Sequence, residues 1–96
     1  YGVPGGENRG QHAHKELFQY VMCLSGSFEI ELYDGFNRQT FFLNKPSMGL
    51  YICPLIWRDL RNFSTGTVCS VLASEIYDEK DYIRDLSEFE KTVRDL

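Results

Sequence analysis

The chain consists of short runs of β-forming residues, each closed by a turn, and this pattern limits most strongly what it can fold into. The clearest run covers residues 28–33, where the hydrophobic positions alternate with Glu29 and Glu31. Such alternation is typical of a strand that buries one face. The pair Asp34-Gly35, which follows directly, is a strong signal for a β-hairpin. We therefore expect two antiparallel strands around this turn.

Similar runs recur along most of the chain, separated by glycine, proline and serine. Near the C-terminus the pattern changes: Ser87 and Glu90 have the spacing of a helix capping box, and Phe89 and Val93 lie four residues apart on one helical face. Many short strands followed by one helix predict an all-β fold, an antiparallel β-barrel or jelly roll with a short C-terminal helix. The other expected strands cover residues 11–14, 18–24, 38–43, 50–53, 56–63 and 67–73.

Length and composition restrict the class of protein further. A chain of 96 residues forms at most one domain, and its small core favours a homodimer. The formal net charge is −4 without a basic stripe, which argues against a nucleic-acid partner. Cys23, Cys53 and Cys69 lie in apolar runs without metal-binding spacing, so we expect reduced, buried thiols. We also expect a cytoplasmic protein without a signal peptide or membrane contact.

Both histidines of the chain fall within the three residues 12–14. Successive side chains of a strand point to opposite faces, so His12 and His14 point the same way, and in a small barrel this can be the interior. Two imidazoles in this position can move protons near neutral pH. The alternative is an interior pair that only hydrogen-bonds. The spacing alone leaves both interpretations open.

The spacing around the histidines is similar to the first sequence motif of the cupins. A metal-binding cupin usually has glutamate where this chain has Gln19, and its second motif supplies a third histidine. That histidine is expected near Arg58 and is absent. Two imidazoles and an amide would leave a divalent cation undercoordinated, so the sequence predicts no metal. The residues that match the motif are Gly6, His12, His14, Gln19 and Gly26.

A longer string identifies the family that the chain resembles. Residues 9–15 read R-G-Q-H-A-H-K, which resembles the R-G-x-H-A-H-K signature of the nucleotide-sugar 3,4-ketoisomerases. These are metal-free cupins that act without a cofactor. The resemblance covers essentially the whole chain. It continues through L-S-G-S at 24–27, D-G at 34–35, G-L-Y-I at 49–52, V-L-A-S at 71–74, Y-D-E at 77–79 and D-Y-I-R at 81–84.

The resemblance implies a specific reaction. The family interconverts 4-keto and 3-keto 6-deoxyhexoses attached to dTDP (thymidine diphosphate, also written TDP), for the synthesis of bacterial deoxyamino sugars. A base removes the proton at C3, an enediol forms, and a proton returns at C4. By matching position, His14 would be the base and His12 its partner or proton relay. The dTDP-linked keto sugar would be the small-molecule partner.

Four further residues are candidates for binding that substrate. Arg9 would face the phosphates, where its fork of donors suits an anion, and Lys15 would add a second phosphate contact. Gln19 could hold a sugar hydroxyl or orient a histidine, and Tyr51 could line the pocket. Each has a plainer interpretation: solvated surface for the two cations, a satisfied buried amide for Gln19, and core packing for Tyr51. The string 78–84 could cap the barrel or contact a partner subunit, without a chemical role.

Full-length members of the family carry strands upstream of the part that matches this chain. We therefore expect residues 1–96 to form a single cupin domain that lacks those N-terminal strands. Without them, a non-catalytic sugar-nucleotide-binding cupin, truncated or fused as a regulatory domain, is the main alternative to an isomerase. A metal-dependent cupin such as an epimerase-like enzyme or a dioxygenase is a second one. Exchange of the C3 proton in heavy water separates an isomerase from a binding protein.

Overall fold

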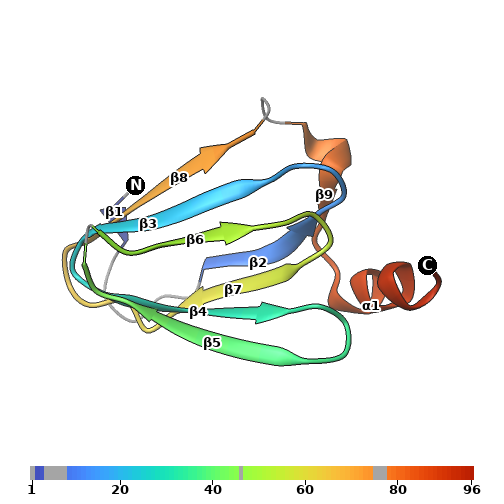
Figure 1. Ribbon diagram of the computed structural model, residues 1–96, viewed down its shortest axis with the longest axis horizontal. Helices are drawn as coiled ribbons and strands as arrows, with labels where there is room; N and C mark the ends of the chain where they lie inside the picture. The colour runs from blue at the N-terminus through green and yellow to red at the C-terminus, as the bar shows by residue number, and fades with distance from the viewer. Residues whose placement is uncertain (1, 4–8, 46, 75–77) are drawn as a thin grey trace.

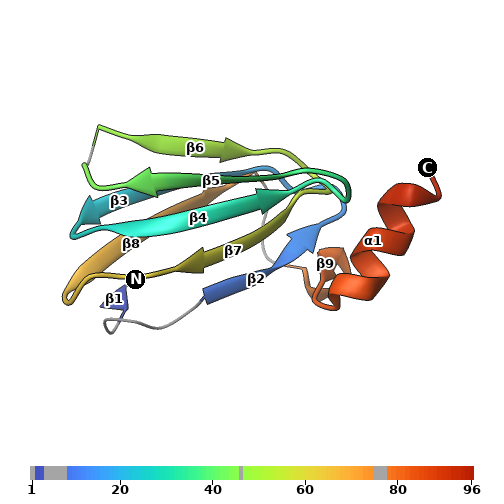
Figure 2. The same cartoon turned by 90° about the horizontal axis from the view of Figure 1, so that it is seen from below.

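A computed structural model describes residues 2–3, 9–45, 47–74 and 78–96. Two antiparallel β-sheets lie face to face, with a helix at one end of the pair (Figures 1 and 2). The four-stranded sheet has the order β1-β8-β3-β6, and the five-stranded sheet has the order β5-β4-β7-β2-β9. This architecture confirms the predicted all-β fold with a C-terminal helix.

The strands agree closely with the sequence pattern. β4, β5 and β8 have the predicted bounds, and the other expected strands differ by one or two residues at their ends. The two-residue strand β9 and the 3-10 turn η1 are too short to leave a periodic pattern, and neither was expected. The elements are β1 (Gly2–Val3), β2 (Arg9–His14), β3 (Gln19–Ser25), β4 (Phe28–Tyr33), β5 (Arg38–Leu43), β6 (Gly49–Ile52), β7 (Trp57–Arg61), β8 (Thr67–Ala73), η1 (Glu79–Asp81), β9 (Tyr82–Ile83) and α1 (Leu86–Arg94).

The main core fills the space between the two sheets. In β4, Phe28 and Ile30 are fully buried, whereas Glu31 on the opposite face pairs with Arg38 at 2.9 Å and Arg61 at 3.0 Å. Cys23 and Cys69 are buried in this core as predicted. Cys53 is exposed, so the expectation of a third buried thiol was wrong. The reason is that β6 ends at Ile52, whose side chain takes the inward position.

A second hydrophobic cluster attaches helix α1 to the outside of the five-stranded sheet. Phe89 and Val93 are buried, as their spacing predicted, and the Phe89 ring lies 5.7 Å from that of Trp57. The predicted cap was wrong: the carboxylate of Asp85 accepts hydrogen bonds from the backbone N–H groups of Ser87 and Glu88. Aspartate is as good a cap as serine and comes two residues earlier, so the helix begins there.

The described part of the chain contains no helix with the length and hydropathy needed to span a bilayer. Its one α-helix instead closes the end of the sandwich where β2 meets β9 (Figure 2). The histidine-bearing strand therefore has a covered outer face, and its inner face is free to form a site.

Candidate functional site

The site is assembled on the inner face of the five-stranded sheet, where β2 lies between β7 and β9. His12 is directly opposite Arg58 of β7, and His14 is directly opposite Tyr82 of β9. Residues directly opposite in an antiparallel pair present their side chains on the same face. Strand register therefore gathers two histidines, an arginine and a tyrosine in one place.

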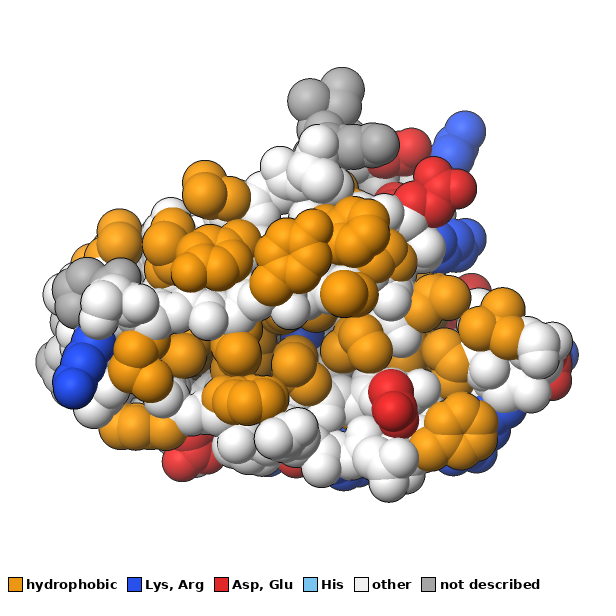
Figure 3. Space-filling view, in the orientation of Figure 1, with side chains coloured by type: hydrophobic (Ala, Val, Ile, Leu, Met, Phe, Trp, Pro, Cys, Tyr) orange, Lys and Arg blue, Asp and Glu red, His pale blue; other side chains and the backbone are white. Residues whose placement is uncertain are grey.

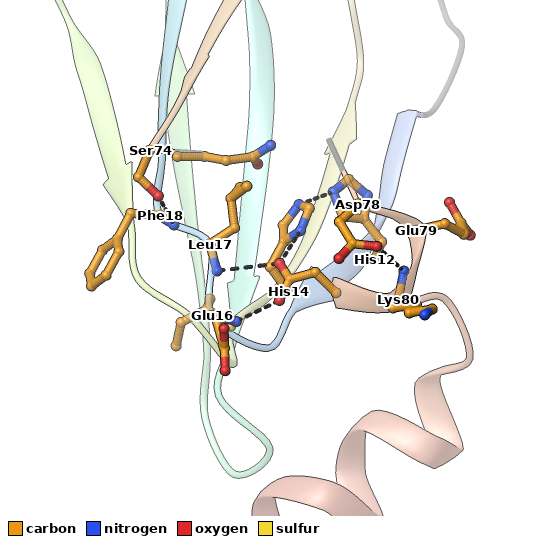
Figure 4. Close-up of polar contacts among 12 residues, drawn as sticks. His12, His14, Glu16, Leu17, Phe18, Ser74, Asp78, Glu79 and Lys80 are labelled. Atoms are coloured by element: carbon orange, nitrogen blue, oxygen red, sulfur yellow. Dashed lines mark hydrogen bonds and ion pairs between the residues drawn. The ribbon is translucent and has the colours of Figure 1, made fainter. Parts of the chain in front are cut away.

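The two imidazoles contact each other through equivalent ring atoms. Nε2 of His12 lies 3.1 Å from Nε2 of His14, and the rings meet edge-on at an interplanar angle of 89° (Figure 4). The Tyr82 ring packs against both, with centroids 4.3 Å from His14 and 5.1 Å from His12. His14 is 0% exposed, whereas His12 borders a cavity. His12 is thus the histidine that a ligand can reach.

Asp81 holds the other side of His14. Its Oδ2 lies 3.2 Å from Nδ1 of His14, and the same carboxylate accepts backbone N–H bonds from Glu16 at 2.8 Å and Leu17 at 3.3 Å. The carbonyl of Asp81 also accepts the N–H of Lys15 at 2.9 Å. The segment that leaves β2 is therefore fastened to Asp81, and the carboxylate is fixed against the imidazole.

The cavity beside His12 has a volume of about 200 Å³ and lies between the two sheets. Its polar wall consists of His12, Arg58 and Tyr82 from the five-stranded sheet and Gln19 from β3. Aliphatic side chains close the remaining walls. Small apolar cavities with a few convergent polar groups are typical binding sites for small molecules.

Arg58 places a positive charge in this buried wall. The residue is 1% exposed; one guanidinium nitrogen donates to Oε1 of Gln19, and Nη2 donates to the carbonyl of Ile56 at 2.9 Å. Within the described residues, its buried Nε has no hydrogen-bond partner. Burial lowers the pKa of Arg58 to about 10, so the group stays charged at neutral pH. A buried charge bonded only to neutral oxygens is costly, and it favours an anion in the cavity.

The same surroundings keep both histidines neutral. Burial, followed by the nearby charge of Arg58, lowers the pKa of His12 to about 3. The pKa of His14 is lowered by the same two causes in the same order, although Asp81 opposes the shift. At pH 7 each ring therefore carries one N–H and one lone pair. Neutral imidazoles can accept a proton.

The structure brings only part of the predicted substrate-binding set to this cavity. Gln19 lines it, whereas Lys15 is exposed and lies outside the lining. The side chain of Arg9 lies outside the described residues. Tyr51 was expected to face the interior, and this was wrong: it is 62% exposed, because Ile52 takes the inward position in β6. Tyr51 instead borders a separate depression of about 340 Å³.

Two site residues, Asp81 and Tyr82, were not recognised from the sequence as part of the chemistry. Arg58 stands where a cupin's third histidine was expected, a replacement that indicated a change in how the pocket holds its ligand, and the structure places it in the cavity wall. Asp81 and Tyr82 lie in the string that was expected to have no chemical role. Asp81 follows its contact partner His14 by 67 residues in the sequence. No local sequence pattern predicts a contact over such a separation.

Two facing antiparallel sheets with neutral histidines and a buried arginine between them define a small cupin-like domain with a site for acid–base chemistry. Comparison with known families agrees with this class. The family model described as WxcM-like, C-terminal, matches residues 1–94. The chain belongs to this family.

Individual relatives are similar over nearly the whole chain. One is a TDP-4-oxo-6-deoxy-alpha-D-glucose-3,4-oxoisomerase of Aneurinibacillus thermoaerophilus, 44% identical over 93 residues, which are 97% of this chain and 67% of that protein. The crystal structure of QdtA, a sugar 3,4-ketoisomerase of Thermoanaerobacterium thermosaccharolyticum in complex with TDP, is 44% identical. It superposes with a TM-score of 0.92, covering 97% of this chain and 68% of that one.

A second crystal structure of QdtA shows the same fold with a sugar nucleotide bound. It is a histidine-to-asparagine variant of QdtA in complex with TDP-4-keto-6-deoxyglucose, with 43% identity and a TM-score of 0.93. The match covers 97% of this chain and 67% of that one.

Proposed function

We propose that this chain is a ketoisomerase that interconverts the 4-keto and 3-keto forms of a 6-deoxyhexose linked to dTDP, in deoxysugar biosynthesis. The observation that carries the proposal is the neutral His12 imidazole, which borders the cavity on the same wall as the buried Arg58 cation. Proton abstraction beside a ketone needs a neutral base and a positive charge near the oxygen that becomes negative. The family membership and the names of its relatives support the same reaction.

The reaction needs one proton to leave C3 and one to reach C4. His12 takes the C3 proton, the C3–H electron pair forms the C3–C4 double bond, and the C4 carbonyl oxygen becomes an enediolate oxygen. A proton shift between the two oxygens and return of the proton from His12 to C4 give the 3-keto sugar. We assign the base role to His12 and the relay role to His14, the reverse of the sequence-based expectation, because His12 borders the cavity and His14 is 0% exposed.

Arg58 would stabilise the enediolate oxygen. Its guanidinium is charged and buried, and a preorganised donor in a site without bulk water acts more strongly than in solution. A fixed positive charge in the cavity wall also opposes a divalent cation there. We propose that the reaction proceeds without a metal or another cofactor. The proposed activity is tested by following conversion of TDP-4-keto-6-deoxyglucose into its 3-keto isomer by NMR.

The phosphates of the substrate are assigned to Arg9, with Lys15 as a second contact. Arg9→Ala is expected to raise the dissociation constant for TDP by roughly 10- to 100-fold, which corresponds to about 1.5–3 kcal/mol for a charge-assisted hydrogen bond. The effect should shrink as salt rises, because screening weakens the wild-type contact. Calorimetry at two salt concentrations measures the change in the TDP dissociation constant and its dependence on salt. Unchanged affinity would mean that the phosphates are held elsewhere, for example by Lys15.

The homodimer remains a proposal, and one surface supports it. The outer face of the four-stranded sheet presents apolar side chains, which Figure 3 shows gathered over β3, β6 and β8. Tyr51 is 62% exposed and Leu72 is 59% exposed, and no charged residue occupies an outward position of these three strands. An uncharged face fits a second uncharged face, so we assign a second copy of this chain as its partner. The outward positions are Tyr20, Met22, Leu24, Gly49, Tyr51, Val68, Ser70 and Leu72.

A charge on this face should separate the subunits. Light scattering is expected to give a dimer for the wild-type chain and a monomer for Leu72→Lys, because a buried unpaired ammonium is costly. Leu86→Lys, which charges an exposed residue at the start of α1, is the matched control and should stay dimeric. A folded wild-type monomer at high concentration would contradict the assignment.

A further inference from the structure

We propose that Asp81 is a positioning residue that fixes the tautomers of both histidines, so that the basic atom of the site is Nδ1 of His12. The inference rests on the proposed isomerase function for its chemical meaning. The inference also makes a structural statement, namely which nitrogen of each histidine ring carries the proton. This can be measured even if the chain has no catalytic activity. The juxtaposition that carries it is the chain of contacts from Asp81 through His14 to His12. Figure 4 shows the part of this chain in which the two imidazoles meet.

The carboxylate is held in one orientation. The N–H of Glu16 donates to Oδ1 at 2.8 Å, and the N–H of Leu17 donates to Oδ2 at 3.3 Å. Asp78 supports η1 independently, because its carboxylate accepts the N–H of Lys80 at 3.0 Å. The Asp81 carboxylate is therefore a hydrogen-bond acceptor held in a fixed orientation beside Nδ1 of His14. An ionised carboxylate only accepts hydrogen bonds, so Nδ1 of His14 must carry the proton.

The proton on Nδ1 of His14 determines which other ring nitrogens of His14 and His12 are protonated. A neutral imidazole has a single N–H, so Nε2 of His14 carries a lone pair. The 3.1 Å contact with Nε2 of His12 is then a hydrogen bond only if His12 donates it. Once Nε2 of His12 is protonated, its Nδ1 is left as the lone pair. Burial, followed by the charge of Arg58, lowers the pKa of both rings, and this supports the neutral state on which the reasoning depends.

The arrangement also stabilises the product of proton abstraction. When Nδ1 of His12 takes the C3 proton, the ring becomes an imidazolium with an N–H at each nitrogen. Its Nε2–H bond to His14 then becomes charge-assisted, and His14 remains anchored by the carboxylate of Asp81. Orienting a catalytic histidine through a buried carboxylate is a known way to hold the correct tautomer. Asp81 acts here through one additional imidazole.

Asp81→Asn is the variant that tests the proposal. With the asparagine oxygen at the Oδ1 position, it still accepts the N–H of Glu16. The NH₂ group then takes the Oδ2 position, where it replaces the longer 3.3 Å bond from Leu17, donates toward Nδ1 of His14 and reverses both tautomers. We expect kcat to fall by about 10²- to 10⁴-fold with little change in TDP affinity. Asp81→Glu keeps an acceptor and should recover part of the loss. Asp78→Asn weakens the cap of η1, where the carboxylate accepts the N–H of Lys80, and it should keep wild-type kcat if Asp81 does more than stabilise η1.

The decisive readout is the ¹⁵N NMR spectrum of the wild-type histidines. We expect His14 protonated at Nδ1 and His12 at Nε2, with both assignments reversed in Asp81→Asn. His14 protonated at Nε2 in the wild-type chain overturns the proposal, even where Asp81→Asn does not fold. Wild-type kcat in Asp81→Asn overturns it as well. The expected tautomers in a chain without isomerase activity would leave this inference standing and refute the proposed function instead.

Discussion

His12→Asn is expected to abolish exchange of the C3 proton of the dTDP-linked 4-keto sugar while the chain still binds TDP. A positioned general base typically contributes about 10²- to 10⁴-fold in rate, and His12 is the imidazole that borders the cavity. Because the pKa of His12 is lowered to about 3, its neutral form persists well below pH 6.5. Wild-type exchange should therefore persist into that acidic range.

His14→Asn separates the two histidine assignments. If His14 is the relay, its loss should reduce the exchange rate less than the loss of His12, because the base atom remains on the cavity wall. Exchange rates at saturating substrate, measured by NMR in heavy water, give the comparison. Wild-type exchange in His12→Asn together with its loss in His14→Asn would restore His14 to the base role that the family resemblance implied.

Arg58→Gln is expected to lower kcat by about 10²- to 10³-fold, the usual effect of removing one donor that stabilises a developing oxyanion. The side chain is 1% exposed and charged at neutral pH, so its positive charge acts where solvent does not screen it. The dissociation constant for TDP should change little, because the charge that Arg58 meets develops on the sugar. Steady-state kinetics and calorimetry measure the two effects separately.

Arg61→Gln is the matched control for that prediction. Arg61 belongs to the same strand but pairs with Glu31 and Asp59 on the outer face, so its loss should leave kcat unchanged. Arg58→Lys keeps the charge without the planar fork and should fall between the wild-type and Arg58→Gln chains. Wild-type kcat in Arg58→Gln would show that the enediolate is stabilised by another group.

Much of the fold could be predicted because its strands and turns leave patterns among neighbouring residues of the sequence. The alternation over residues 28–33 gave the bounds of β4 directly, and the Asp34-Gly35 pair marked the turn that follows. Gly35 has a φ of +100°, a conformation that favours glycine. The inward face of β6 was assigned wrongly, because apolar residues at consecutive positions of a short strand do not show by alternation which face is buried. Tyr51 and Cys53 were therefore expected inside, whereas Ile52 is the buried residue.

The site was less predictable, because the contacts that define it connect distant parts of the chain. The His-x-His pattern indicated a histidine pair, and strand geometry predicted that both rings share a face. Which of the two rings reaches the cavity depends on β9, a two-residue strand that brings Tyr82 opposite His14. Asp81 reaches His14 only because η1 ends directly before that strand. Neither element leaves a periodic signal.

The central claim is that this chain removes the C3 proton of a dTDP-linked 4-keto-6-deoxy sugar. The most direct test is to incubate the purified wild-type chain with TDP-4-keto-6-deoxyglucose in heavy water and to follow deuterium by NMR and mass spectrometry. The account predicts deuterium at C3 of recovered substrate and at C4 of the 3-keto product, with the loss of both in His12→Asn. A wild-type chain that binds the sugar nucleotide but introduces no deuterium and forms no 3-keto product would contradict it.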